Sequence, residues 1–205
     1  MTISVQAAIA SRISINTFQT NRPLDDATIA SLVDLATKAP SAYNLQNWRF
    51  VVARSQEAKA RLESSAYGQK KITAASAAFV ICGTLEAHTQ LASALVPSVK
   101  AGFMPASMAD AWQSQAYKSH EGNDELQRDE AVRSASLASM TLMLAAQGMG
   151  LGSCAMSGFD AGQVAQEFGL ASTELPVLIV VVGYPDQGNW PQKPRRPVSE
   201  VLTIV

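Results

Sequence analysis

Two apolar runs, A-A-F-V-I-C at residues 77–82 and P-V-L-I-V-V-V at residues 176–182, decide the fold class. Each has the length of a strand and neither alternates apolar with polar residues, which is typical of central strands covered on both faces. The run R-F-V-V-A at residues 49–53 reads as a further strand. We therefore expect a sheet that lies between two layers of helices.

Helices are predicted on either side of these strands. Apolar residues recur at spacings of three and four ahead of Pro40, at Ile29, Leu32, Val33 and Ala36. This helix is expected to begin after an N-cap at Asp25 and to end just before Pro40. Further helices are expected at residues 1–11, 57–65, 87–95, 106–119 and 131–148. The last contains a single charge, Arg133, in a run of Ala, Ser, Met and Leu, so we expect burial on nearly all sides.

The composition indicates one domain, residues 1–205, with 47% hydrophobic residues available for a core. Charged residues make up only 16% of the chain, below the roughly 25% of typical soluble domains, so part of the surface is expected in an oligomer interface. The net charge of −1 argues against nucleic acid and acidic membranes as partners. The sequence contains no apolar stretch long enough to span a membrane, no phosphate-binding loop motif, and no Ser-His-Asp or Cys-His arrangement typical of a hydrolase.

The cysteines and histidines predict neither a disulfide framework nor a metal site. Cys82 and Cys154 lie far apart in apolar settings, as buried free thiols do in a reducing cytoplasm. His88 and His120 have no closely spaced Cys or carboxylate neighbours, so no metal is assigned. The N-terminus lacks the basic region of a secretory signal, and a cytoplasmic protein is expected.

Residues 39–48, A-P-S-A-Y-N-L-Q-N-W, join the predicted helix to the first strand with hydroxyl and amide groups. One interpretation is a loop that grips a ligand; the other is a polar connection with a half-buried tryptophan. A similar choice applies to the basic segment around residue 195, which alone would read as a solvated turn, and to Lys71, which alone would read as a surface lysine.

Six motifs in one order along the chain resemble the FMN-dependent nitroreductase family, above all its short bacterial members associated with quinone and nitroaromatic reduction. They are R-x-S-x-N-x-F at Arg12, Ser14, Asn16 and Phe18, P-S-A-Y-N-L-Q at 40–46, G-Q-x-K-I-x-x-A-S at 68–76, G-x-G-L-G-S-C-A-M-S-G-F-D at 148–160, V-G-Y-P at 182–185 and K-x-R-R-P at 193–197. The related pattern R-D-E-A-V-R-S-A-S-L occupies residues 128–137.

The resemblance implies an α+β fold, a three-layer α/β/α sandwich around a mixed, mostly antiparallel sheet. It also implies a homodimer in which the 131–148 helix forms the dimer core and the tail at 199–205, expected to be extended, embraces the partner. Small residues on that helix would let another helix approach closely: Ala131, Ala135, Ala138, Ser139 and Ala145. A buried monomeric core helix is the alternative. Residues 85–125 are a possible lid or substrate-pocket insertion in which Trp112 and Tyr117 either face a pocket or simply pack.

The resemblance assigns cofactor-binding residues but no catalytic side chain, because FMN carries the hydride. The phosphate is assigned to Arg12, Ser14, Lys193 and Arg195. The pyrimidine edge is assigned to Asn16, Gln69 and Lys71, and the flavin N5 to Met156, Ser157 and Gly158. Pro40, Ser41 and Asn44 are assigned to the flavin of the partner subunit.

The expected function is hydride transfer from NAD(P)H through FMN to nitroaromatic or quinone acceptors with ping-pong kinetics. Two alternatives remain. Many relatives have Lys or Arg at Asn16 and Pro at Ala155, and some have Glu at Ser157, which motivates a flavin-binding protein without NAD(P)H turnover. A flavin-dependent dehydrogenase or dehalogenase of the same fold is the other.

Overall fold

An antiparallel sheet of four strands, in the order β1-β2-β4-β3, organises the 3–205 region that the computed structural model describes. The strands are β1 (Trp48–Ala53), β2 (Ala77–Thr84), β3 (Gly152–Met156) and β4 (Glu174–Gly183). The two apolar runs are the central strands β2 and β4, as predicted. All three strand pairs are antiparallel. Among the described residues, parallel pairing occurs at an isolated bridge between Ser14 and Ser153, which is not one of the strand pairs of the sheet.

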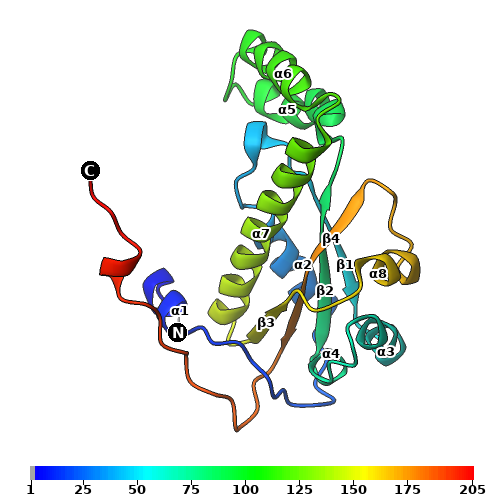
Figure 1. Cartoon of the computed structure of the whole chain (residues 1–205), viewed down its shortest axis with the longest axis vertical. Coiled ribbons are helices and arrows are strands. Elements are labelled where there is room, and N and C mark those ends of the chain that lie inside the picture. The colour runs from blue at the N-terminus through cyan, green and yellow to red at the C-terminus, as the bar shows by residue number, and fades with distance from the viewer. Residues whose placement is uncertain (1–2) are drawn as a thin grey trace.

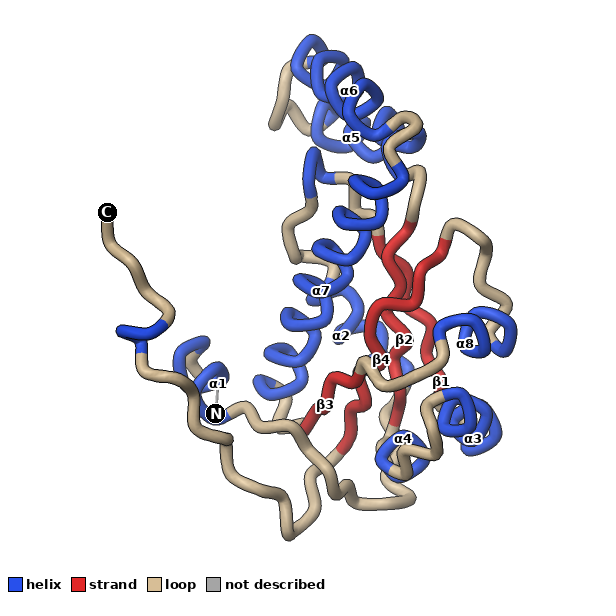
Figure 2. The backbone as a smooth tube through the Cα atoms, viewed as in Figure 1, coloured by secondary structure: helices blue, strands red, loops and turns tan. Residues whose placement is uncertain are grey.

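Helices cover both faces of the sheet (Figures 1 and 2). Helices α2 (Asp26–Ala36) and α7 (Asp124–Gly148) pack on one face, and α3 (Gln56–Ser65), α4 (Lys71–Ala74) and α8 (Ala161–Glu167) lie on the other. Successive residues of β2 alternate between these layers, because side chains in a strand alternate in direction. Phe79 and Ile81 join the cluster with Leu142 of α7, whereas Val80 joins the cluster with Ile72 of α4. The three-layer α/β/α prediction is confirmed.

Local sequence explains where several helices begin and end. The carboxylate of Asp25 accepts a hydrogen bond from the amide of Thr28 (2.7 Å), so the predicted N-cap of α2 is confirmed. Helix α2 ends at Ala36, three residues earlier than the 39 expected, because residues 37–39 form a turn before Pro40. Helix α3 begins one residue before the predicted position.

Helix α7 is longer than predicted and is not buried on all sides. It begins at Asp124, after an N-cap at Asn123, and one stripe of it faces solvent, with Leu137 46% and Met140 37% exposed. The small residues expected to let another helix approach are buried within the chain: Ala131, Ala135, Ala138 and Ser139 are fully buried. Helix α2 of the same chain packs against α7, and the role of α7 as a dimer core stays a prediction.

Gly83 shows how closely α7 approaches β2. A Cβ at Gly83 would lie 2.5 Å from the carbonyl oxygen of Ala131, so no side chain fits between β2 and α7 at this point. The close contact explains why α7 is poor in bulky residues where it crosses the strand.

Residues 85–125 form a helical hairpin at one end of the sheet (Figure 1). It comprises the short η2 (Ala87–Gln90), α5 (Leu91–Lys100) and α6 (Ala106–His120), and it has its own apolar cluster that includes Leu91, Leu95 and Ala116. Helix α5 continues through Pro97, five residues beyond the predicted end.

Helix α1 and the C-terminal tail lie to one side of the sheet, and the tail runs away from the sheet towards its end (Figure 1). Helix α1 (Val5–Ser11) buries only Ala8, whereas Val5 and Ile9 are exposed. Met1 and Thr2, included in the predicted first helix, lie outside the described residues. The tail contains a short turn, η3 (Val198–Glu200), and is irregular from 202 onward, so the expectation of an extended tail holds only in part. Among residues 3–205, no helix is long and apolar enough to cross a membrane.

Candidate active site

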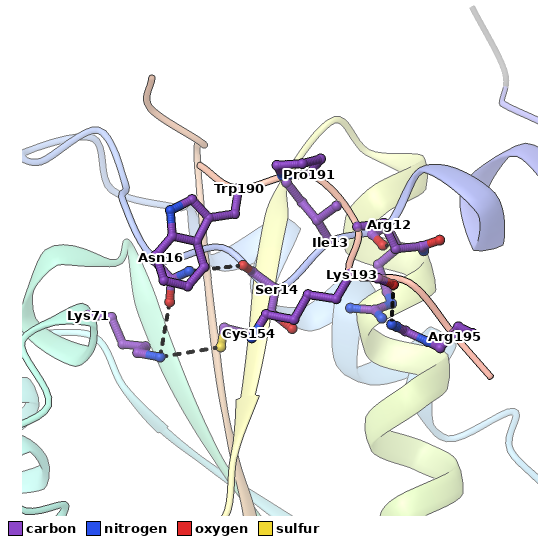
Figure 3. A pocket seen from close by; sticks show the side chains of 11 residues that line it. Arg12, Ile13, Ser14, Asn16, Lys71, Cys154, Trp190, Pro191, Lys193 and Arg195 are labelled. Atoms are coloured by element: carbon purple, nitrogen blue, oxygen red, sulfur yellow. Dashed lines mark hydrogen bonds between the residues drawn. The ribbon is translucent and has the colours of Figure 1, made fainter. Parts of the chain in front are cut away.

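A cavity of about 230 Å³ lies where the N-terminal segment, helix α4 and the C-terminal loop meet (Figure 3). Six of the predicted cofactor-binding residues line it: Arg12, Ser14, Asn16, Lys71, Lys193 and Arg195. The structure thus brings together residues from both ends of the chain that sequence alone could not place side by side.

The charge of this cavity is strongly one-sided. Four of its lining residues are the cations Arg12, Lys71, Lys193 and Arg195, and none of the lining residues within 3–205 is acidic. The whole chain has a net charge of −1, so this local positive charge is not a general property of the protein. Guanidinium and ammonium groups gathered without carboxylates favour a phosphate or another anion.

The N-terminal segment is extended around Ile15, so its side chains point alternately into the protein interior and towards the cavity. The amide of Ile15 donates to the carbonyl oxygen of Ser153 at 3.0 Å, and the side chains of Ile15 and Phe18 are each 3% exposed. Because side chains alternate in extended chain, Ser14 and Asn16 point to the side opposite Ile15. They are exposed and line the cavity.

Lys71 reaches the cavity from the first turn of α4. Its Nζ lies 3.4 Å from Oδ1 of Asn16 and 3.7 Å from Sγ of Cys154 (Figure 3). These contacts leave the ammonium at the cavity wall, available to an anionic or electron-rich group.

Two side chains of α3, Lys59 and Glu63, fix the position of α4. Nζ of the buried Lys59 donates to the carbonyl oxygens of Thr73 (3.0 Å) and Ala75 (2.6 Å), which caps the end of α4, and burial lowers the pKa of Lys59. Glu63 accepts hydrogen bonds from Lys70 (2.7 Å) and Thr73 (2.5 Å), and these bonds, led by the one from Lys70, lower its pKa. These contacts of Lys59 and Glu63, which we call the α3 buttress, orient the helix that carries Lys71.

Three predicted residues lie together at the end of β3. Met156 is 6% exposed at the last position of the strand, followed by the exposed Ser157 and Gly158. Nε2 of Gln69 donates to the carbonyl oxygen of Gly158 at 2.7 Å, which joins the segment before α4 to the segment after β3. A Cβ on Gly158 would lie 3.4 Å from that same Nε2, an ordinary contact at its lower limit.

Pro40, Ser41 and Asn44 are not brought to this cavity within one chain. They flank or lie in the short η1 (Ala42–Asn44), which packs against the α5–α6 hairpin at the other end of the sheet. This loop is conformationally strained, since three of its non-glycine residues have positive φ: Tyr43 (51°), Asn44 (60°) and Gln46 (49°). Its geometry is held by Ser41 Oγ, which accepts from the amide of Gln46 at 2.9 Å.

The two aromatic residues proposed for a pocket pack against neighbours in the hairpin. Tyr43 lies edge-on to Trp112 with ring centroids 6.0 Å apart, and Tyr117 lies edge-on to His88 at the same separation. Tyr117 also keeps 53% of its surface exposed and lines a shallow groove between η2 and α6. Within one chain neither residue reaches the cationic cavity.

Comparison with known proteins identifies the family. The model of the nitroreductase family matches residues 9–184. The chain belongs to the nitroreductase family. It is 34% identical over 195 residues to YodC of Bacillus subtilis, which carries the name of an NAD(P)H nitroreductase, and the match covers 95% of this chain and 96% of YodC.

Solved nitroreductase structures agree with the fold. A nitroreductase from Exiguobacterium sibiricum, solved in complex with FMN, superposes with a TM-score of 0.92 at 26% identity and full coverage of both chains. A protein from Staphylococcus epidermidis described as an NAD(P)H:FMN oxidoreductase superposes with a TM-score of 0.93 at 25% identity, covering 100% of this chain and 98% of that one.

The donor set of the nitroreductase cavity fits a flavin mononucleotide. Cations suited to a phosphate lie on one side, and Lys71 and Asn16 offer donors for the polar edge of a ring. The other predicted residues, Gln69, Met156, Ser157 and Gly158, are not among the lining residues of this cavity. The described residues contain no group of three or more His, Cys, Asp or Glu able to hold a metal ion.

Sequence analysis missed five lining residues: Ile13, Cys154, Trp190, Pro191 and Gln192. Cys154 was expected only as a buried free thiol, yet it points to the same face as Met156 because the two are separated by one residue in a strand. Trp190 lies in a stretch that sequence showed only as irregular; its ring lies 5.6 Å from the ammonium of Lys193. No periodic signal marks such loop residues. The second cysteine, Cys82, is buried away from the cavity lining, and burial raises its pKa to about 12.

Proposed function

We propose that this nitroreductase-family protein is an FMN-dependent oxidoreductase that transfers hydride from NAD(P)H to nitroaromatic or quinone acceptors. The observation that carries the proposal is the cavity lined by four cations and no acid among the described residues, built by the family's motifs. The FMN complex of the Exiguobacterium relative supports the choice of flavin.

In this proposal the phosphate of FMN is held by Arg12, Lys193 and Arg195, with the hydroxyl of Ser14 as an additional donor. Arginine presents two parallel N–H groups to a phosphate, and lysine adds a point charge. One such contact between charged groups contributes about 1.5–3 kcal/mol.

The other donors orient the ring. Lys71, fixed by its α3 buttress, places positive charge beside the pyrimidine, where it stabilises the ring once it has gained electrons. Asn16 and Gln69 supply amide donors along the same edge. Met156, Ser157 and Gly158 would place backbone groups beside the ring of a bound FMN, which would supply the hydride-transfer chemistry.

The proposed site is composite and the active species a homodimer. A cavity of about 230 Å³ is smaller than the ~300–1,000 Å³ of typical cofactor pockets, so one chain supplies only part of the enclosure. Pro40, Ser41 and Asn44 would complete the site of the partner, and the hairpin at 85–125 would act as its lid.

Exposed apolar side chains support that assembly. They gather on α1, on one stripe of α7 and along the tail: Val5, Ile9, Leu137, Met140, Val198, Val201, Leu202 and Ile204. Apolar groups grouped in this way mark interaction surfaces. The exchanged tail and the reducing, cytoplasmic setting suggested by two free cysteines belong to the same proposal.

Steady-state kinetics with NADPH or NADH and a quinone or nitroaromatic acceptor test the function. If the nicotinamide donor and the acceptor occupy the same site in turn, double-reciprocal plots of rate against donor concentration, at several acceptor concentrations, give parallel lines. Intersecting lines would contradict the alternating mechanism, and flavin that binds without NAD(P)H turnover would favour a binding protein.

A further inference from the structure

The phosphate side of the cavity is built from two chain ends more than 170 residues apart. Arg12 and Ser14 precede the sheet, whereas Lys193 and Arg195 lie in a loop without helix or strand, where every residue from 191 to 197 is exposed. Holding such a loop in one conformation costs backbone entropy at every ordered residue. Something other than apolar burial must therefore fix the loop before a ligand arrives.

The side chain of Asn189 makes that connection with four hydrogen bonds. Its Oδ1 accepts from the amides of Asn16 (2.7 Å) and Thr17 (3.0 Å), and its Nδ2 donates to the carbonyl oxygens of Thr17 (2.8 Å) and Asp186 (2.9 Å). An asparagine amide has two donor hydrogens and two acceptor lone pairs, so its full capacity is used. Asn189 binds Thr17 through both N–H and C=O, as a neighbouring strand would.

Gln192 forms a second tie of the same kind, three residues further on. Its Nε2 donates to the carbonyl oxygen of Arg12 at 3.0 Å. The two amides thus hold the backbone at both Arg12 and Asn16 against the loop that carries the other phosphate-side cations.

We propose that Asn189 is a positioning residue that pre-assembles the phosphate subsite, with Gln192 as the weaker second tie. The inference rests on the proposed FMN site. Asn189 is absent from the cavity lining, so it acts through the backbone of Asn16 and Thr17 rather than by touching the ligand. Pre-organisation lowers the ordering cost paid on binding, which makes its loss visible as weaker affinity.

Two flavins distinguish this role from a general structural one. Riboflavin shares the ring and ribityl chain of FMN but lacks the phosphate. Asn189→Ala should raise the dissociation constant of FMN about tenfold, which corresponds to about 1.4 kcal/mol. It should raise that of riboflavin no more than about threefold, because of the residues that it positions only Asn16 serves the ring. Gln192→Ala, which removes one hydrogen bond instead of four, should raise the FMN constant about threefold.

The experiment is a titration of FMN and riboflavin into full-length apoprotein, followed by flavin fluorescence. Asn123→Ala is the matched control, because Asn123 also bonds through both ends of its amide, to Leu126 (3.1 Å) and Ser119 (3.3 Å), but at the start of α7. It should lower the melting temperature and leave both constants unchanged. If Asn189→Ala does not fold, Asn189→Ser carries the test, because its hydroxyl can keep part of these hydrogen bonds and it too lies outside the cavity lining.

The outcomes separate the two claims. Wild-type protein that binds no FMN overturns the proposed function and this inference with it. Wild-type protein that binds FMN overturns the inference alone in two cases: when the Asn189 and Gln192 variants bind FMN as tightly, or when they lose FMN and riboflavin affinity equally.

Discussion

The sheet core and the cationic cavity are built by opposite means. In the core, apolar side chains of regular strands and helices are removed from water, and Phe79, Ile81 and Leu142 are fully buried. In the cavity, polar side chains on irregular and largely exposed segments are held by individual hydrogen bonds, such as the four of Asn189. Stability should therefore depend on the first region and ligand affinity on the second, and substitutions should separate the two properties.

The largest expected effect is loss of stability from the core. Phe79→Ala removes a fully buried aromatic ring between β2 and α7 and should lower the free energy of unfolding by about 3–5 kcal/mol. Urea denaturation measures the loss. Under native conditions the FMN dissociation constant should stay within about threefold, which is under 1 kcal/mol; a loss of affinity as large as the loss of stability would break the comparison.

The next effect falls on the cavity. Arg12→Ala should weaken FMN binding by about 1.5–3 kcal/mol and change the stability of the apoprotein by no more than about 0.5 kcal/mol. Arg196→Ala is the matched control, because Arg196 is exposed in the same loop and outside the cavity lining. An FMN dissociation constant unchanged by Arg12→Ala would remove this arginine from the site.

A smaller effect sharpens the role of Lys71. Lys71→Met removes the positive charge at the ring side of the cavity and should make the bound flavin harder to reduce. For a partly exposed charge the loss is about 1 kcal/mol, or roughly 20 mV for a two-electron couple. A reduction potential measured against a reference dye gives the shift. Lys70→Met, which removes the neighbouring lysine paired with Glu63, should leave the potential unchanged.

The smallest effect concerns the buttress of α4 and depends on pH. The folded-state pKa of Glu63 is lowered, first by Lys70 and then by Thr73, so its contribution to stability is present above its unfolded pKa of about 4.3. That contribution is lost as pH falls through the folded pKa. Glu63→Gln should cost about 1 kcal/mol at pH 7 and less at pH 3.5. Urea midpoints at the two pH values test this, and a pH-independent difference would exclude the charge of Glu63 as the cause.

Sequence predicted the regular part of the molecule well and the site only in part. The apolar runs of β2 and β4 and the N-cap at Asp25 carry local signals, so their structure follows from composition and spacing. The length of α7 could not be predicted in this way, because its first turns are polar and its small residues suit packing on either a sheet or a partner helix. The family motifs predicted that Arg12, Lys71 and Lys193 bind the cofactor, and in the structure these three residues line one cavity.

Other site features have no local signal at all. Asn189 and Trp190 lie in a loop whose conformation depends on contacts with a segment more than 170 residues away. The strained loop that contains Tyr43 and Asn44 was recognised by its polar residues, but its position at the far end of the sheet depends on how the α5–α6 hairpin packs. Long-range packing of this kind cannot be inferred from spacing.

The most direct test of the central claim is a visible spectrum of the purified protein, reconstituted with FMN, under anaerobic conditions before and after addition of NADPH and then NADH. The account predicts protein-bound flavin bands that bleach when reduced nicotinamide is added and return when a quinone follows. Bands that persist with both nucleotides would contradict the reductase function, and protein that retains no FMN would contradict the site itself.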